Sequence, residues 1–277
     1  MNLHENKDAF AAAIQFASTP KQEGGLGIKQ IYIEKDYWIC RSLKQLSECK
    51  ESEVAVFKGG TSLSKAYLLG NRFSEDIDIA ITSDSQRTDN QTKNIISRIS
   101  KVMSAGLEEV QNPATRKYSK YRKAFYRYPV TTENEIIGAI NPGQILLEIV
   151  SFANPYPYQK VFIKSFLTEY LENVGRNDII EAYGMQGFDI QVLAKSRTAT
   201  EKLVSLIRHS LSADYISELK AKIRHFYDLY FLWNDPESRA YLTLFDQLWA
   251  DRRKMKDVTE QVLERIRQCR PVRRPPQ

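Results

Sequence analysis

The feature that most constrains this chain is a pair of aspartates inside an apolar run. Residues 73–81 read FSEDIDIAI, so that Asp76 and Asp78 are separated by a single isoleucine. The apolar residues predict a buried strand, and alternate residues of a strand face the same side. Two carboxylates so close together repel each other unless a cation lies between them. Magnesium fits that place, because it prefers carboxylate oxygens and often completes its shell with substrate phosphates.

Two glycines precede this strand, at the end of another short apolar run. Residues 57–67 read FKGGTSLSKAY, which predicts a turn at Gly59 and Gly60 and a short helix from Thr61. Glycine lets the backbone approach a ligand closely, and a helix start offers free N–H groups to an anion. The spacing is not that of a Walker A loop. A phosphate held beside a paired-aspartate metal site predicts a pocket for a nucleoside triphosphate.

Glu148 is the third carboxylate of interest, because it stands alone in the apolar run ILLEIV. One interpretation is a carboxylate on the exposed face of an edge strand. A glutamate in the middle of so apolar a strand is more easily explained as a metal ligand beside Asp76 and Asp78.

The residue pattern predicts an α/β (α+β) front part and a helical back part. Helices are expected at about 5–18, 32–48, 61–69 and 92–110, and strands at 52–57, 73–81, 120–130, 143–152, 160–163 and 187–193. A turn at Asn141, Pro142 and Gly143 precedes one strand, which is expected to pair antiparallel with 120–130. Helices follow at 197–210, at 217–233 and onward to about 268. The expected domains are 1–194, 195–270 and a disordered basic tail at 271–277.

Composition narrows the class of protein. The 277 residues carry a formal net charge of +6, a modest excess that permits an anionic partner such as nucleic acid. The odd number of cysteines, with no CxxC spacing, argues against a disulfide framework and a zinc site. No signal peptide or membrane-spanning run is apparent, so we expect a cytoplasmic protein without a membrane partner.

A basic and aromatic segment, KYSKYRKAFYRYP, covers residues 117–129. Cations between aromatic rings suit RNA, through phosphate contacts and base stacking. The residues expected to contact RNA are Lys120, Arg122, Lys123 and Arg127. The alternative is an ordinary half-exposed strand with long cationic side chains.

Together these motifs resemble the nucleotidyltransferase superfamily, and more narrowly the AbiEii/AbiGii abortive-infection toxin family. The resemblance is carried by IEKDYW at 33–38, FKGGTSLSKAY at 57–67, RFSEDIDI at 72–79, EKL at 201–203 and RHFYDLYFL at 224–232. It implies a nucleotidyltransferase-fold lobe, a helical lobe and an active site in the cleft between them. It also implies a toxin of a toxin–antitoxin or phage-defence system, with a cognate antitoxin as a partner.

The resemblance further implies a reaction and its residues. Some family members transfer a nucleotide from an NTP to the 3′ acceptor end of tRNA, which blocks translation. Gly60, Thr61 and Ser62 would hold phosphate, while Asp76 and Asp78 would hold two magnesium ions. Lys202 and Asp228 match the family's essential lysine and aspartate.

The residues of the helical part allow these roles but also plainer ones. Lys202 lies on an amphipathic helix, where its ammonium can neutralise a triphosphate or simply be solvated. Arg224 and Asp228 share a helix face, so they fit either triphosphate binding or a structural ion pair. Glu34, Lys35 and Asp36 are interpreted as structural. Two other functions stay open: nucleotidyl transfer to a small molecule or a protein, and nucleotide binding without catalysis.

Overall fold

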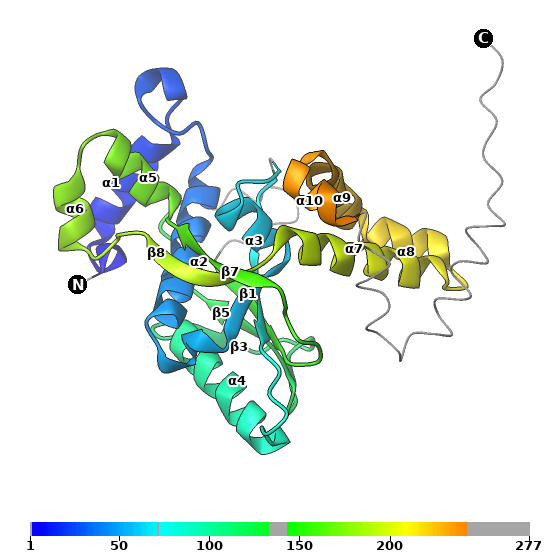
Figure 1. The fold of residues 1–277 in the computed structure, drawn as a ribbon. Helices are drawn as coiled ribbons and strands as arrows, with labels where there is room; N and C mark the ends of the chain where they lie inside the picture. Colours follow the sequence, from blue (N-terminus) through cyan, green and yellow to red (C-terminus); the bar gives the residue numbers. More distant parts are fainter. Residues whose placement is uncertain (1, 71, 133–142, 243–277) are drawn as a thin grey trace, which may run out of the picture. The chain divides into compact units, whose positions relative to one another are not determined.

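The computed structural model describes residues 2–70, 72–132 and 143–242. The chain divides into two compact units, Met1–Ala194 and Lys195–Gln277. The first unit combines a mixed sheet with helices, and the second is helical in its described part (Figure 1). The α/β fold class predicted from the sequence is therefore confirmed. The turn predicted at Asn141 and Pro142, the helices predicted after residue 242 and the predicted basic tail lie outside the described residues.

In the described residues of the first unit, the sheet contains eight strands in the order β3-β5-β6-β2-β1-β8-β7, with β4 paired to β5. The pairs β2/β6 and β1/β8 are parallel, and the other neighbouring strands of this sheet are antiparallel. The antiparallel pairing predicted between residues 120–130 and 143–152 is confirmed as β5/β6. The strands are β1 Ala55–Lys58, β2 Asp76–Ile81, β3 Glu108–Val110, β4 Arg116–Lys117, β5 Tyr121–Arg127, β6 Gln144–Val150, β7 Tyr158–Ile163 and β8 Phe188–Leu193.

Helices α2 and α4 cover one face of this sheet and pack against each other. The strand residues on that face are buried, as shown by Ile77 and Ile79 of β2 and Leu147 and Ile149 of β6. The other helices of the unit are α1 and α3, both expected, and α5 and α6, which were not predicted. The bounds are α1 Lys7–Ser18, α2 Gln30–Ser47, α3 Gly59–Ala66, α4 Asp89–Met103, α5 Phe166–Asn173 and α6 Asn177–Ala182.

Helix α4 shows where the sequence pattern is right about an element and wrong about its end. Thr88 caps the start, since its hydroxyl accepts from the Gln91 N–H at 3.2 Å and the Gln91 side chain accepts from the Thr88 N–H at 2.7 Å. The helix stops at Met103, although a helix was expected to about 110. Gly106 adopts a positive φ of 80°, and the chain reverses so that β3 can pair with β5.

Up to residue 242, where its described part ends, the second unit contains α7 Lys195–Ser210, α8 Tyr215–Ala221, α9 Ile223–Asn234 and α10 Pro236–Leu242. The single helix expected at 217–233 is therefore two helices that meet at Lys222. Lys195, at the start of α7, forms ion pairs at the start of α10, because its ammonium lies 2.9 Å from Asp235 and 2.7 Å from Glu237. None of the helices in the described part of the chain is long and apolar enough to cross a membrane.

Candidate active site

The two aspartates of β2 share a face of the sheet, as their spacing predicts. Asp76 and Asp78 are half-buried, whereas Ile77 and Ile79 between and after them are 1% and 0% exposed. Because neighbouring side chains of a strand point to opposite faces, the aspartates lie opposite the face that α2 and α4 cover. We call this side of the sheet the carboxylate face.

Strand register brings a row of charges together on the carboxylate face. Asp78 is paired with Lys58 of β1 on one side and with Glu148 of β6 on the other. Glu148 is paired in turn with Lys123 of β5. Directly paired residues point to the same face, so the row reads cation, carboxylate, carboxylate, cation across four strands. The sequence predicted the two inner members as neighbours but did not identify Lys58 as an outer one.

The start of helix α3 lies against this row. Gly59 has a positive φ of 82°, and a Cβ atom built on it would lie 2.1 Å from Oδ2 of Asp78. Only glycine therefore fits at this position while Asp78 keeps its place. The N-cap residue Lys58 makes no side-chain capping bond. The N–H groups at a helix start are favourable donors for an anion.

Thr61 and Ser62 differ from the expectation in how their side chains are used. Both are buried, at 1% and 0% exposure. The Thr61 hydroxyl donates to the backbone carbonyl of Asp76, and the Ser62 hydroxyl donates to the carbonyl of Gly59 at 2.9 Å. The hydroxyls thus tie helix α3 to β2 and to its own first turn. A phosphate role for these residues stays a prediction, and it would rest on their backbone N–H groups.

Tyr121 is a member of the carboxylate face that the sequence did not single out for the active site. It is paired with Val150 on β6, two residues from Glu148, so its side chain lies on the same face as the Glu148 carboxylate. Burial, the charge of Glu148 and the charge of Asp78 raise the pKa of Tyr121 to about 12. The phenol is therefore a neutral donor at physiological pH.

The donor atoms of the carboxylates fit a magnesium site in part. Asp76 and Asp78 present carboxylate oxygens on one half-buried face, and these are the ligands that magnesium prefers. Among the described residues, no group of three or more His, Cys, Asp and Glu side chains is arranged to hold a metal ion. Glu148 thus does not complete a three-ligand set by itself here. Magnesium usually takes one or two carboxylates plus water and phosphate, so the metal site stays a prediction centred on the two aspartates.

In the helical unit, Lys202 and Asp228 form an ion pair between α7 and α9. The Lys202 Nζ lies 2.7 Å from Oδ2 of Asp228, and the two side chains are 9% and 5% exposed. Lys202 is therefore not a solvated lysine. Beside them, burial and the charges of Lys202 and Lys222 lower the pKa of His225 to about 4. Arg224 is exposed. The catalytic and nucleotide-binding roles of Lys202, Arg224 and Asp228 stay predictions.

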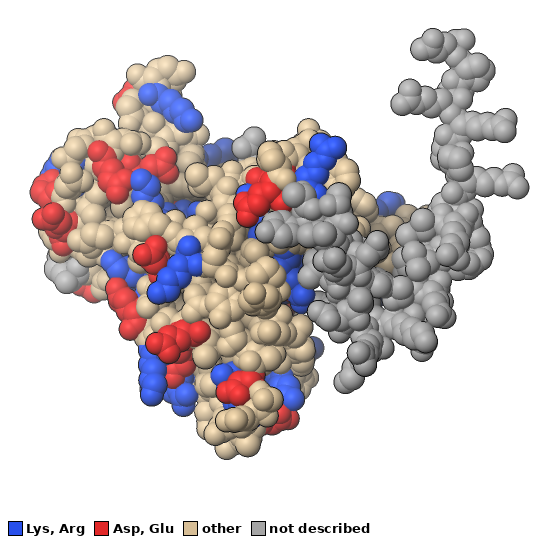
Figure 2. All heavy atoms as spheres, viewed as in Figure 1, with Lys and Arg blue, Asp and Glu red and all other residues tan. Residues whose placement is uncertain are grey.

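The basic segment does not form the single patch that its sequence indicates. Strand alternation places Lys123 and Arg127 on the carboxylate face but turns Arg122 to the opposite face, where it is paired with Ile149. Acids that are distant in sequence also lie nearby, since Lys120 pairs with Asp89 at 2.8 Å and Arg127 with Glu108 at 3.4 Å. In Figure 2 the basic and acidic side chains visible among the described residues are likewise interspersed. RNA contact by these cations stays a prediction.

Three consecutive charges on α2 are among the most buried of the unit. Glu34, Lys35 and Asp36 are each 1% exposed, and each binds a different segment of the chain. The signal in the sequence was a charged triplet inside an apolar helical pattern, which fits the structural interpretation given to it. The partners are Thr131 and Thr132 for Glu34, Glu75 for Lys35, and Lys65 and Phe166 for Asp36.

A cavity of about 460 Å³ in the first unit adjoins α3, and its volume is in the range of small-molecule binding sites. Thr61, Arg72 and Ser74 line it together with Tyr32 and Phe73, whose rings stack at 4.9 Å. The cavity therefore borders α3, which carries the predicted phosphate residues, and the segment that links α3 to β2.

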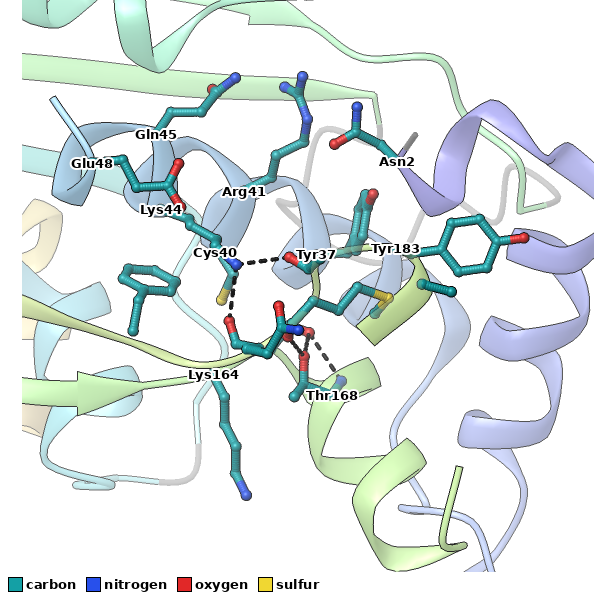
Figure 3. Close-up of a pocket in the computed structure, with 16 residues that line it drawn as sticks. Asn2, Tyr37, Cys40, Arg41, Lys44, Gln45, Glu48, Lys164, Thr168 and Tyr183 are labelled. Carbon is teal, nitrogen blue, oxygen red and sulfur yellow. Dashed lines mark hydrogen bonds between the residues drawn. The ribbon is translucent and has the colours of Figure 1, made fainter. Parts of the chain in front are cut away.

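Another cavity, of about 380 Å³, is lined by α2 and by residues of the α5–α6 region (Figure 3). One of its cations, Lys44, donates hydrogen bonds to the carbonyls of Gly184 at 2.7 Å and Gln186 at 3.3 Å. Burial raises the pKa of Cys40 to about 12, so this thiol is not a nucleophile at physiological pH. None of the predicted site residues lines this cavity.

Solved structures of two bacterial proteins resemble this chain at low sequence identity. MenT4, a nucleotidyltransferase toxin of Mycobacterium tuberculosis H37Rv, is 19% identical with a TM-score of 0.41, and the match covers 72% of this chain and 59% of MenT4. JHP933 of Helicobacter pylori is 16% identical with a TM-score of 0.36, over 84% of this chain and 97% of its own. No curated protein matches the chain.

The family comparison covers much more of the sequence than any one motif does. Residues 41–275 match the family described as nucleotidyl transferase AbiEii toxin of type IV toxin–antitoxin systems. The matched range includes the paired aspartates, the glycines at the start of α3, Glu148 and the Lys202–Asp228 pair. The chain therefore belongs to the AbiEii nucleotidyl transferase toxin family.

Proposed function

We propose that this protein transfers a nucleoside monophosphate from an NTP to an RNA hydroxyl, with the 3′ acceptor end of tRNA as the acceptor. The observation that carries the proposal is the charge row of the carboxylate face, where Asp78 and Glu148 are in register beside the start of α3. Family membership supports nucleotidyl transfer, and the choice of tRNA rests on the resemblance alone.

Asp76 and Asp78 are the carboxylates that would hold magnesium. When bound, magnesium would neutralise triphosphate charge and make the acceptor hydroxyl more acidic. The half-buried position of both aspartates favours such a cation, because two carboxylates on one face of a strand repel each other without it.

The chain's own groups account for the rest of the reaction. The N–H groups at the start of α3 would bind phosphate oxygens, and Lys58 and Lys123 flank the carboxylates with positive charge. The acceptor oxygen forms a bond to the α-phosphorus while the bond from that phosphorus to the bridging oxygen breaks. Pyrophosphate leaves, and the hydroxyl proton passes to a carboxylate, for which we assign Glu148.

Lys202, Arg224 and Asp228 are included as residues that the reaction requires. Their assignment rests on the family resemblance together with one structural fact, the buried Lys202–Asp228 pair. Asp228 would fix the Lys202 ammonium in place, and that charge would offset the triphosphate. The same toxin family implies a cognate antitoxin as partner, and unrestrained transfer to tRNA would slow growth of a bacterial host by blocking translation.

The test is incubation of the purified protein with total tRNA, magnesium and each NTP in turn. With one of the four, a label on the α-phosphate should enter tRNA, whereas a label on the γ-phosphate should leave as pyrophosphate. Periodate oxidation of the tRNA 3′ diol is the matched control and should abolish incorporation. Absence of α-label incorporation with every NTP would overturn the proposal, and undiminished labelling of oxidised tRNA would overturn the 3′ end as acceptor.

A further inference from the structure

Three aromatic rings stack in series at one end of the carboxylate face. The Tyr118 and Tyr121 rings have centroids 6.4 Å apart and planes 22° apart. The Tyr121 and Phe152 rings continue the series at 6.0 Å and 24°. We call Tyr118, Tyr121 and Phe152 the aromatic ladder. Both spacings lie in the range of offset-stacked aromatic pairs.

Backbone hydrogen bonds fix the ladder to the sheet. The Tyr118 N–H donates to the Tyr121 carbonyl at 2.7 Å and closes the hairpin between β4 and β5. The Ser151 N–H donates to the Lys120 carbonyl at 2.9 Å and holds the segment that carries Phe152. The rings are therefore presented by sheet-anchored backbone, so little conformational freedom is lost when something stacks on them.

The outer rings of the ladder are turned to solvent. Tyr118 is 62% exposed and Phe152 is 70% exposed, whereas Tyr121 between them is half-buried. Single exposed aromatics are common on protein surfaces and need no explanation. Two exposed rings stacked on both sides of a third one are different, because their π-faces are preformed and do not serve the core of the unit.

The ladder begins at the carboxylates. Its middle ring, Tyr121, lies on the carboxylate face, because it is paired with Val150, two residues along β6 from Glu148. An occupant of the ladder would therefore reach the row of charges that we propose as the site of transfer.

Cations are neighbours of the ladder residues in the sequence. Residues 114–123 read ATRKYSKYRK, with five lysines and arginines and no aspartate or glutamate, and Arg122, one of this set, points to the opposite face of the sheet from Tyr121. Lys117 and Lys120 have acidic partners, Glu109 at 2.6 Å and Asp89 at 2.8 Å, but these pairs are partly exposed. Exposed pairs contribute little to stability, so phosphate can replace the acids at small cost.

We infer that the aromatic ladder is a stacking platform for unpaired bases of a single-stranded RNA acceptor. This inference rests on the proposed function for its acceptor, and it assigns the binding of that acceptor to Tyr118, Tyr121 and Phe152. Bases of any identity stack on aromatic rings, while neighbouring cations bind the backbone phosphates. The ladder therefore selects an unpaired end and not a particular sequence.

The test measures binding separately from transfer. A short single-stranded RNA with a fluorescent 5′ end is titrated without NTP, and its anisotropy gives the affinity. The variant is Tyr118→Leu/Phe152→Leu, which keeps apolar area and every charge but removes the outer π-faces. The control is Phe16→Leu/Phe162→Leu, since those rings are 59% and 58% exposed and lie outside the ladder. Equal melting temperatures establish that all proteins are folded.

We expect the ladder variant to bind the single strand about tenfold or more weakly, as stacking contributions of about 1–3 kcal/mol per base imply. The control should bind like the wild type. Duplex RNA of the same length, whose bases are already stacked, should bind both ladder variant and wild type equally. A DNA single strand should show the same loss if stacking alone is responsible.

An unchanged affinity of the ladder variant for single-stranded RNA overturns the inference, and so does an equal loss of affinity for duplex RNA. The result is separable from the proposed function. If the wild type transfers the α-label but the ladder variant binds RNA normally, the proposed function holds and the stacking platform is ruled out. If the ladder variant binds RNA more weakly but the wild type transfers no label, the stacking platform holds and the proposed function is ruled out.

Discussion

At the residue scale, the Tyr121 phenol reports on the carboxylate face. Its pKa is raised to about 12 by burial, by Glu148 and by Asp78. Glu148→Gln should lower this pKa, because a neutral amide no longer disfavours the phenolate, but burial should keep it above the ordinary value of about 10. Carbon-13 NMR of labelled tyrosine rings, assigned with Tyr121→Phe, measures the titration.

The matched control for that substitution is Glu109→Gln, which neutralises a carboxylate in an exposed pair with Lys117. The Tyr121 titration should be the same in this control as in the wild type. If Glu148→Gln left the Tyr121 pKa at its wild-type value, the proximity of these two side chains on the carboxylate face would be contradicted.

At the element scale, the buried charges of α2 hold this helix to its surroundings. The Lys65 Nζ lies 2.7 Å from Oδ1 of Asp36, and the side chains are 8% and 1% exposed. Burial disfavours the Lys65 ammonium, but Asp36 outweighs it and raises the pKa of Lys65. Asp36→Ala should therefore lower the free energy of unfolding by about 3–5 kcal/mol, because it leaves a buried charge without its carboxylate. Urea unfolding of the purified protein measures this.

Two further variants separate loss of the pair from loss of packing. Asp36→Leu/Lys65→Met should recover most of the stability, since apolar residues of similar volume often replace a buried ion pair without cost. Asp178→Ala, in an exposed pair with Arg176, should leave the urea midpoint unchanged. A midpoint for Asp36→Ala equal to that of Asp178→Ala would show that Asp36 does not hold α2 in place.

The elements themselves follow from sequence where their signals are local. The alternation around Asp76 and Asp78 predicts β2 and its faces. The glycines at 59 and 60 predict a turn before a helix that starts at Thr61, whereas α3 already begins at Gly59. Partners distant along the chain do not follow. Lys35 pairs with Glu75, 40 residues away, and nothing in either local pattern indicates the other. By contrast, the local sequence is enough to predict that Arg122 and Lys123 point to opposite faces of the sheet, because side chains alternate along a strand such as residues 121–127.

At the scale of the whole molecule, the buried Lys202–Asp228 pair tests whether the helical unit takes part in the reaction. Lys202→Met alone should destabilise the protein, because it removes the cation that lies 2.7 Å from the buried Asp228 carboxylate. Lys202→Met/Asp228→Leu should restore the melting temperature. If the Lys202 charge serves catalysis, this double variant should be stable and still transfer label about a hundredfold more slowly than the wild type. A stable double variant that transfers label at the wild-type rate would show that the ion pair has a structural role and no role in catalysis.

The proposed reaction is tested most directly by the rate at which Asp78→Asn transfers the α-label to tRNA in the presence of magnesium. This substitution keeps size and shape, and it removes the carboxylate against which Gly59 packs. Asp84→Asn, in the exposed loop after β2, is the control and should transfer at the wild-type rate. We expect Asp78→Asn to melt at or above the wild-type temperature and to transfer the label at least about a hundredfold more slowly. Transfer at the wild-type rate by folded Asp78→Asn would contradict the proposed reaction.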